Sequence, residues 1–241
     1  RYGDAVLKKG ESLLVISQSG ETADTIAAMR MGKNAGCKTA AICNVIGSTV
    51  AREVDRVLYT YCGPEIAVAA TKSYLMQVLV LYLTALDLAY KRGEITAETL
   101  KGRIRELMSI PAKIQKVLDN RSLIQYFASR EFAVKHVFFI GRGMDYALAL
   151  EAALKLKEIS YIHSEAYAAG ELKHGTIALI EDGSLVVALA TQDALLPKMA
   201  SNMEEVKVRG AHVLAVTNGI WDGAAAHSHE QWEIERVDPT L

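Results

Sequence analysis

The sequence predicts an α/β fold with two tandem three-layer subdomains, each with a mainly parallel sheet between helices. Apolar runs of strand length alternate with helical patterns, and this alternation is typical of parallel sheets covered on both faces. The 241 residues, 51% of them hydrophobic, are enough to bury two cores. The strand-like runs are Leu13 to Ser17, Thr39 to Cys43, Arg56 to Thr60, His136 to Ile140, Ser184 to Ala190 and Val213 to Thr217.

A repeat supports the division into two subdomains. A strand, a polar loop, a helix, a glycine and a second strand follow one another in 12–44 and again in 184–218. The second copy is preceded by a further strand at Val137 and by a helix after Gly143. No equivalent precedes Val6, so we expect the first copy to lack its opening strand and helix.

Helical segments are predicted between the copies, from Glu65 to about Arg92 and from Thr96 to about Arg130, with a break before Pro111. The predicted organisation is a partial first subdomain over 1–95, a helical connector over 96–130 and a second subdomain over 131–241. The uncharged stretch 73–86 is shorter than the roughly 20 residues that a bilayer requires. We therefore predict a core or subunit-interface helix there and no membrane span.

Charge and cysteine content narrow the class of partner. The 27 basic and 28 acidic residues nearly cancel, which disfavours nucleic acid and acidic membranes and favours a small molecule. Cys37, Cys43 and Cys62 have neither the pattern of a disulfide framework nor metal-ligand spacing, so an intracellular, reducing compartment is expected. Because the chain begins with Arg1, it is interpreted as part of a longer polypeptide.

The loop after the first strand has the composition of a phosphate site. Ser17, Ser19 and Thr22 offer hydroxyl donors, Gln18 an amide, and Gly20 close approach of the backbone. The first turn of the following helix has unpaired N–H groups that favour an anion. The alternative is a simple helix cap with Ser19 at the N-cap. In the second copy the corresponding loop, 191–193, contains an acid, and it is predicted to be the poorer phosphate site.

The helix after Gly143 has Glu151, Lys155 and Glu158 at i, i+4 and i+7 on one face. The simpler interpretation is a solvated face with one ion pair. The alternative is a catalytic pair, with Glu158 as general base and Lys155 binding a substrate oxygen. The apolar side of this helix is expected to contain Ala149, Ala152, Leu156 and Ile159.

Two segments contain histidines that could take part in chemistry. His174, in a loop rich in small residues, is a candidate acid or base, although a lone histidine is more often structural. The segment 227–230 has His at i and i+2, which is weak evidence for a metal, and it is treated as a loop. Gly141-Arg142-Gly143 lacks the third glycine of a dinucleotide motif, so a nicotinamide cofactor is disfavoured and neither cofactor nor metal is expected.

With these residues in view, the chain resembles the sugar isomerase (SIS) domain of glutamine-dependent fructose-6-phosphate aminotransferases. The resemblance runs essentially end to end and is carried by three stretches, 17–25, 151–161 and 165–175. It implies two SIS-type subdomains, binding of the phosphate of fructose 6-phosphate at Ser17, Gln18, Ser19 and Thr22, and sugar contact through the backbone of Val68.

The resemblance further implies that Glu158 moves a proton between C1 and C2 to give glucosamine 6-phosphate, with Lys155 beside the sugar. It implies that His174 assists ring opening from a neighbouring subunit, hence a homodimer, and that the partners include a glutaminase domain of the same cytoplasmic polypeptide. The family's Schiff-base lysine is expected beyond Leu241, so the fragment alone is expected to be inactive or nearly so. The alternatives are another isomerase or deglycase of this fold and a non-catalytic sugar-phosphate sensor.

Overall fold

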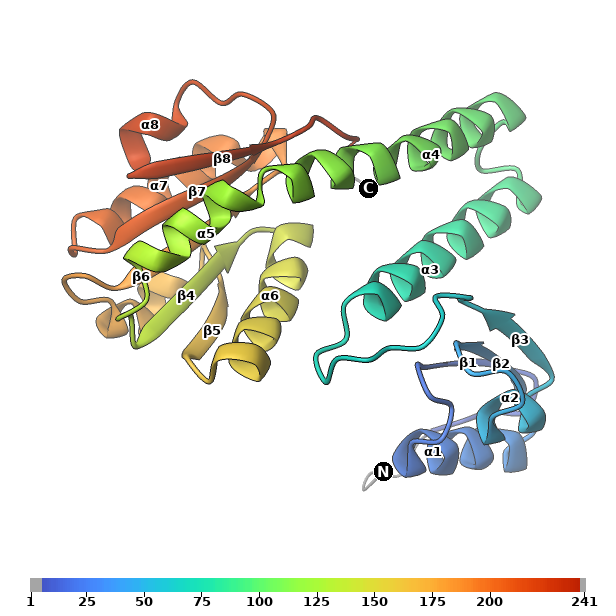
Figure 1. The fold of residues 1–241 in the computed structure, drawn as a ribbon. Coiled ribbons are helices and arrows are strands. Elements are labelled where there is room, and N and C mark those ends of the chain that lie inside the picture. Colours follow the sequence, from blue (N-terminus) through green and yellow to red (C-terminus); the bar gives the residue numbers. More distant parts are fainter. Residues whose placement is uncertain (1–5, 239–241) are drawn as a thin grey trace. The chain divides into compact units, whose positions relative to one another are not determined.

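The computed structural model describes residues 6–238, which form two compact units, unit 1 up to Leu100 and unit 2 from Lys101 (Figure 1). Both units are α/β, and every described strand pair is parallel, which confirms the predicted fold class. The predicted boundaries at 95 and 130 stay a prediction.

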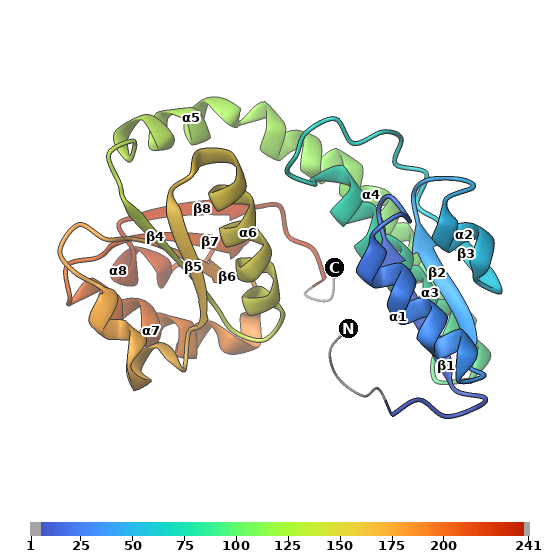
Figure 2. The ribbon, with the colours of Figure 1, turned by 90° about the horizontal axis from the view of Figure 1, so that it is seen from below.

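Unit 1 has a three-stranded sheet of order β1-β2-β3. Its elements are β1 (Ser12–Ser17), α1 (Ala23–Asn34), β2 (Lys38–Cys43), α2 (Thr49–Glu53), β3 (Arg56–Tyr59) and α3 (Lys72–Lys91). One face of the sheet packs on α1 and α2 through a small cluster that includes Val15, Met29 and Val50, and Figure 2 shows α1 lying along the sheet. On the other face of the edge strand β1, Leu14 and Ile16 stay about 40% exposed, so β1 is less buried than its continuous apolar run predicts.

Unit 2 has a five-stranded sheet of order β5-β4-β6-β7-β8. The chain enters it through α4 (Ala97–Asp119) and continues through α5 (Arg121–Arg130), β4 (His136–Gly141), α6 (Met144–Ser160), β5 (His163–Ala168), the 3-10 helices η1 (Leu172–His174) and η2 (Thr176–Leu179), β6 (Leu185–Ala190), the 3-10 helix η3 (Asp193–Leu195), α7 (Leu196–Lys207), β7 (His212–Asn218), α8 (Ala224–His227) and β8 (Glu230–Ile234). Strands β6, β7 and β8 correspond to β1, β2 and β3 of the repeat.

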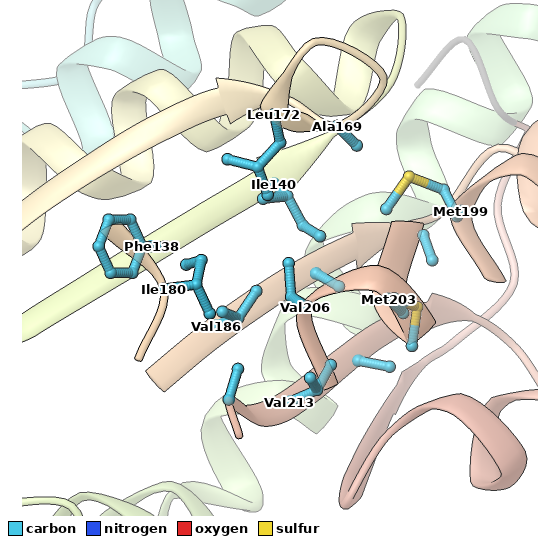
Figure 3. Close-up of a cluster of buried hydrophobic side chains, with 14 residues drawn as sticks. Phe138, Ile140, Ala169, Leu172, Ile180, Val186, Met199, Met203, Val206 and Val213 are labelled. Carbon is cyan, nitrogen blue, oxygen red and sulfur yellow. The ribbon is translucent and has the colours of Figure 1, made fainter. Parts of the chain in front are cut away.

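Alternate residues of β4 point into two cores, as expected for a central strand of a parallel sheet. Phe138 and Ile140 join a cluster in which α7 contributes Met199 and Met203 (Figure 3). Val137 and Phe139 face the opposite side, where they pack with residues of α5 and α6 such as Phe127, Ala149 and Ala153. Unit 2 therefore has three layers.

The helical segments differ from the prediction in two places. Residues 65–71 are not helical: α3 begins at Lys72, and the carboxylate of Glu65 accepts the backbone N–H of Ser73 at 3.0 Å, ending the loop there. The predicted break before Pro111 is also wrong, because α4 continues through this residue to Asp119. Contacts with the segment after β8 hold the helix on both sides of the proline: Glu106 accepts the N–H of Asp238, and Lys113 donates to the carbonyl of Arg236.

Helix α3 is the one helix among the described residues that is long and apolar enough to cross a membrane by length and composition alone. Its most hydrophobic window is largely unburied within this chain, and Leu75 and Leu88 are more than half exposed. Helices of soluble proteins pass the same composition test, so this property by itself does not distinguish a membrane span from an interface helix.

Candidate functional site

The predicted phosphate loop connects the carboxyl end of β1 to the amino end of α1. Thr22 occupies the N-cap of α1 and makes no side-chain capping hydrogen bond. The alternative with Ser19 at the N-cap is wrong, because Ser19 Oγ accepts the N–H of Glu21 within the loop at 3.2 Å. The Thr22 hydroxyl therefore stands at a helix end that no side chain caps, which is the arrangement that favours an anion.

This loop is fastened to itself and to α2. The buried Ser17 Oγ accepts the N–H of Gly20 at 2.9 Å, and the carbonyl of Gly20 accepts the N–H of Val50 at 3.0 Å. The carboxylate of Glu21 accepts the N–H of Thr49 at 2.7 Å, and this bond lowers the pKa of Glu21. Ser17 thus braces the loop through its acceptor while its hydroxyl proton stays available to donate. Helix α2, which sequence reasoning did not find, supplies the support.

A pocket of ≈ 590 Å³ lies at the carboxyl ends of the three strands of unit 1. Of the predicted binding residues, Gln18 lines it; sequence reasoning missed the other lining residues, Asn44, Val45, Ile46, Tyr61, Gly63, Pro64 and Glu65. Ligands of open parallel sheets bind at this edge, so the position of Asn44 directly after the second strand was the signal available.

Asn44 organises the wall of this pocket. Its Oδ1 accepts the hydroxyl of Thr60 at 2.9 Å and the N–H of Cys62 at 3.1 Å, while its Nδ2 donates to the carbonyl of Gly63 at 2.7 Å. The predicted sugar contact, Val68, lies farther along the same connection to α3, with its side chain 98% exposed.

In unit 2, α6 brings together the predicted base, Glu158, and the lysine predicted to bind a substrate oxygen, Lys155. Lys155 Nζ lies 2.6 Å from Glu158 Oε2 and 3.5 Å from Glu151 Oε1. Partial burial lowers the pKa of Lys155, but the hydrogen bond to Glu158 and the charges of both glutamates outweigh this effect and raise the pKa overall. Lys155 is therefore a cation at neutral pH. On the same helix Ile159 is 66% exposed, so its predicted place on the apolar side is wrong.

His174 does not lie with Lys155 and Glu158 in this unit. Glu158 is in the last turn of α6 and precedes β5, whereas His174 is the last residue of η1 and follows β5. Leu172 of η1 packs in the core cluster with Met199 and Met203 of α7, whereas α6 packs on the opposite face of the sheet. Figure 2 shows α6 and β5 side by side.

In the second copy of the repeat, acidic side chains contact the loop that corresponds to the phosphate loop. The carboxylate of Asp145 accepts the N–H of Thr191 at 2.9 Å and also the Thr191 hydroxyl. Burial raises the pKa of Asp145, and these hydrogen bonds act against the increase. Asp193 pairs with Arg236. These two acids make the end of β6 unfavourable for an anion, in agreement with its predicted role as the poorer phosphate site.

The histidine segment near the carboxyl end is engaged in structural contacts. His227 Nδ1 lies 3.1 Å from Glu204, and His229 Nδ1 accepts the N–H of Val213 at 3.0 Å. His227 ends α8, and Glu230 pairs with Arg130 and opens β8, so the predicted loop is wrong at both of its ends. Within residues 6–238, no group of three or more His, Cys, Asp or Glu side chains is arranged to hold a metal ion.

Known protein families and solved structures share this architecture. The SIS domain family matches residues 1–87 and 132–237, more than half of the chain. A glutamine–fructose-6-phosphate aminotransferase [isomerizing] of Caldanaerobacter subterraneus subsp. tengcongensis is 58% identical over 215 residues, which are 89% of this chain and 35% of that protein. The enzyme of the same name from Symbiobacterium thermophilum is 48% identical over the whole chain and 40% of its own length. The chain thus spans little more than a third of these relatives.

Solved structures agree. The C-terminal domain of the glucosamine-fructose-6-phosphate aminotransferase of Francisella tularensis superposes with a TM-score of 0.91 at 36% identity, over 99% of this chain and 68% of that one. A structure from Thermotoga maritima described as glucosamine-6-phosphate deaminase gives a TM-score of 0.69 at 26% identity, over 91% and 63%. The chain belongs to the SIS domain family, and within it to the group formed by the C-terminal part of the fructose-6-phosphate aminotransferases.

Proposed function

We propose that this chain is the sugar-isomerising part of a glutamine–fructose-6-phosphate aminotransferase. The observation that carries the proposal is the loop between β1 and α1, where an uncapped helix end meets the hydroxyls of Ser19 and Thr22. This loop fits a phosphate monoester, and the names of the relatives support fructose 6-phosphate as the phosphorylated sugar. Gln18 and Ser17 complete the phosphate contacts, and the backbone of Val68 contacts the sugar.

The proposed chemistry needs a base and a cation. Ammonia from glutamine condenses with the C2 carbonyl of fructose 6-phosphate, and water leaves. Glu158 then removes a proton from C1 of the fructosimine while the imine nitrogen takes up a proton, which gives an enolamine. Glu158 returns its proton at C2 while the C1 hydroxyl loses its own, which gives the aldose glucosamine 6-phosphate. Lys155, held 2.6 Å from Glu158 and kept cationic by its glutamate neighbours, binds a sugar oxygen. No cofactor or metal takes part in this scheme.

The experiment that tests this function uses the full-length parent protein with fructose 6-phosphate and glutamine, measuring glucosamine 6-phosphate. The ammonia would come from a glutaminase domain of the same polypeptide, which we propose to be soluble and cytoplasmic. The likeness to the Thermotoga maritima deaminase favours a second candidate, a deglycase or an aldose-ketose isomerase. Product formation from other sugar phosphates without glutamine, together with none from fructose 6-phosphate and glutamine, would establish that candidate instead.

The phosphate contacts predict a change in substrate affinity. In the full-length protein, Thr22→Val removes a hydroxyl at the end of α1 and is expected to raise KM for fructose 6-phosphate about tenfold, because a hydrogen bond to a charged group contributes about 1.5–3 kcal/mol. The value of kcat should change little, since the phosphate does not react. Ser129→Ala removes an exposed hydroxyl of α5 and is the control. A change in kcat with KM intact would contradict the binding role.

The separation of Glu158 from His174 predicts a site shared between subunits. We propose that the two residues act on one sugar from different copies of the chain, which requires a homodimer. Glu158→Gln and His174→Asn full-length proteins are each expected to be nearly inactive. Mixing them under conditions that exchange subunits should restore up to about a quarter of the wild-type activity, since half of the dimers are mixed and each has one intact site. Persistent inactivity of proven mixed dimers would show that one subunit supplies both residues.

A further inference from the structure

The amino ends of β4 and β5 place two histidines side by side, and the proposed function assigns neither of them a role. His136 and His163 are the first residues of these strands and are paired in register. Their Nδ1 atoms lie 3.3 Å apart, and the rings meet nearly at right angles, at 79°. Both side chains are on the surface, and β5 is an edge strand, so the pair is open to solvent.

This spacing fits a metal ion. Two imidazole nitrogens bound to one tetrahedral Zn²⁺ at about 2.0–2.1 Å are separated by roughly 3.3–3.4 Å. The χ2 torsion of histidine is broad, so a small rotation of either ring aims both lone pairs at one point. Imidazole ligands suit zinc, copper and nickel and do not suit magnesium or calcium.

The outer nitrogen of His163 already has the partner that a metal-binding histidine requires. Glu165 Oε1 lies 3.5 Å from His163 Nε2, and a carboxylate in this position keeps the proton on Nε2 and leaves Nδ1 free to bind a metal. The other oxygen of Glu165 accepts the hydroxyl of Tyr167. Burial and the carboxylate raise the pKa of Tyr167 to about 12, so this hydroxyl stays protonated and holds Glu165 in place.

The other adjoining histidines of unit 2 lack these properties. His212 and His229 have ring centroids 4.8 Å apart, but His229 Nδ1 accepts a backbone N–H. The Nδ1 atom of His227 contacts the carboxylate of Glu204 and not another histidine. Among the described residues, His136 and His163 are the histidine pair whose ring nitrogens contact each other directly.

We propose that His136 and His163 form a surface site for a divalent transition-metal ion of the zinc class, with Glu165 as the outer partner of His163. Water completes the coordination, because residues 6–238 arrange no third protein ligand there, and the affinity is expected in the micromolar range. A bound ion ties the edge strand β5 to β4. It therefore fixes the segment between Glu158 and His174 without touching either. The site does not depend on the proposed function.

The test is calorimetric titration of the 241-residue chain with Zn²⁺ alone, with Mg²⁺ as the second ion. We expect one Zn²⁺ per chain, a loss of at least tenfold in affinity in His136→Gln and in His163→Gln, and a roughly tenfold loss in Glu165→Gln. His227→Gln should bind as the wild type does. Zn²⁺ should also raise the Tm of the wild type and leave that of His163→Gln unchanged.

Two results would overturn the site. One is unchanged Zn²⁺ affinity and stoichiometry in both histidine variants, and the other is equal binding of Mg²⁺. If a variant fails to fold, the ¹⁵N resonances of the wild-type imidazoles decide the question. Zn²⁺ should shift Nδ1 of His136 and of His163 together, and a shift confined to other histidines contradicts the proposal.

Discussion

Replacement of Glu158 by glutamine in the full-length protein is expected to lower the rate of glucosamine 6-phosphate formation by about 10²–10⁴-fold. The amide has nearly the shape of the carboxylate but cannot accept the C1 proton. Lys155 keeps its second partner, Glu151, at 3.5 Å, so the cation stays in place and KM for fructose 6-phosphate should change little. The measurement is steady-state amino-sugar formation with fructose 6-phosphate and glutamine saturating.

Three further measurements make this expectation specific to proton transfer. Exchange of the C1 hydrogen of the sugar with deuterated solvent should be lost together with product formation, while glutamine hydrolysis persists. Glu151→Gln leaves Lys155 its nearer partner, so its effect should be much smaller than that of Glu158→Gln. Glu204→Gln, which removes a surface carboxylate facing His227, is the neutral control. Retention of more than a tenth of the activity in Glu158→Gln would rule out this residue as the base.

The predictability of the strands follows from their burial. The central strand β6, Leu185–Ala190, is apolar throughout because both of its faces are covered, and the sequence pattern alone indicates it. Strand β5 is not among the predicted strands, since His163, Glu165 and Tyr167 alternate with small residues. Strand β8, Glu230–Ile234, was missed for the same reason. Both lie at the edges of the sheet, where an uncovered face allows polar side chains.

The parts of the site that the sequence predicts are local in the chain, and the parts that it does not predict depend on residues far apart in the sequence. The loop from Ser17 to Thr22 is contiguous in the sequence, so its hydroxyls and its position before a helix could be found there. The ion pair of Glu151 with Lys155 also follows from the i, i+4 spacing on a helix. In contrast, the role of Asn44 depends on hydrogen bonds to residues 16 to 19 positions away, and the distance of His174 from Glu158 depends on the undetected strand β5.

Gly20→Ala is expected to damage the phosphate loop more than any substitution of its polar side chains. Gly20 has φ +67°, and a Cβ built there would lie 2.1 Å from Ser48 Oγ and 2.8 Å from Cys43 Sγ. Left-handed strain and overpacking together should cost about 2–4 kcal/mol of the free energy of unfolding. Thermal unfolding of the 241-residue chain measures this loss, and KM for fructose 6-phosphate in the full-length protein measures the displacement of Ser19 and Thr22.

A second glycine with positive φ separates the effect of backbone strain on stability from the effect of overpacking. Gly10 has φ +89° and nothing within 4 Å of the added Cβ, so Gly10→Ala carries the backbone strain without the collision. It should cost only about 1–2 kcal/mol and leave KM unchanged. Adding Ser48→Gly to Gly20→Ala removes the nearest colliding atoms and should recover part of both losses, since glycine is tolerated at the N-cap of α2. Equal losses in Gly10→Ala and Gly20→Ala would mean that close packing against Ser48 does not hold the phosphate loop.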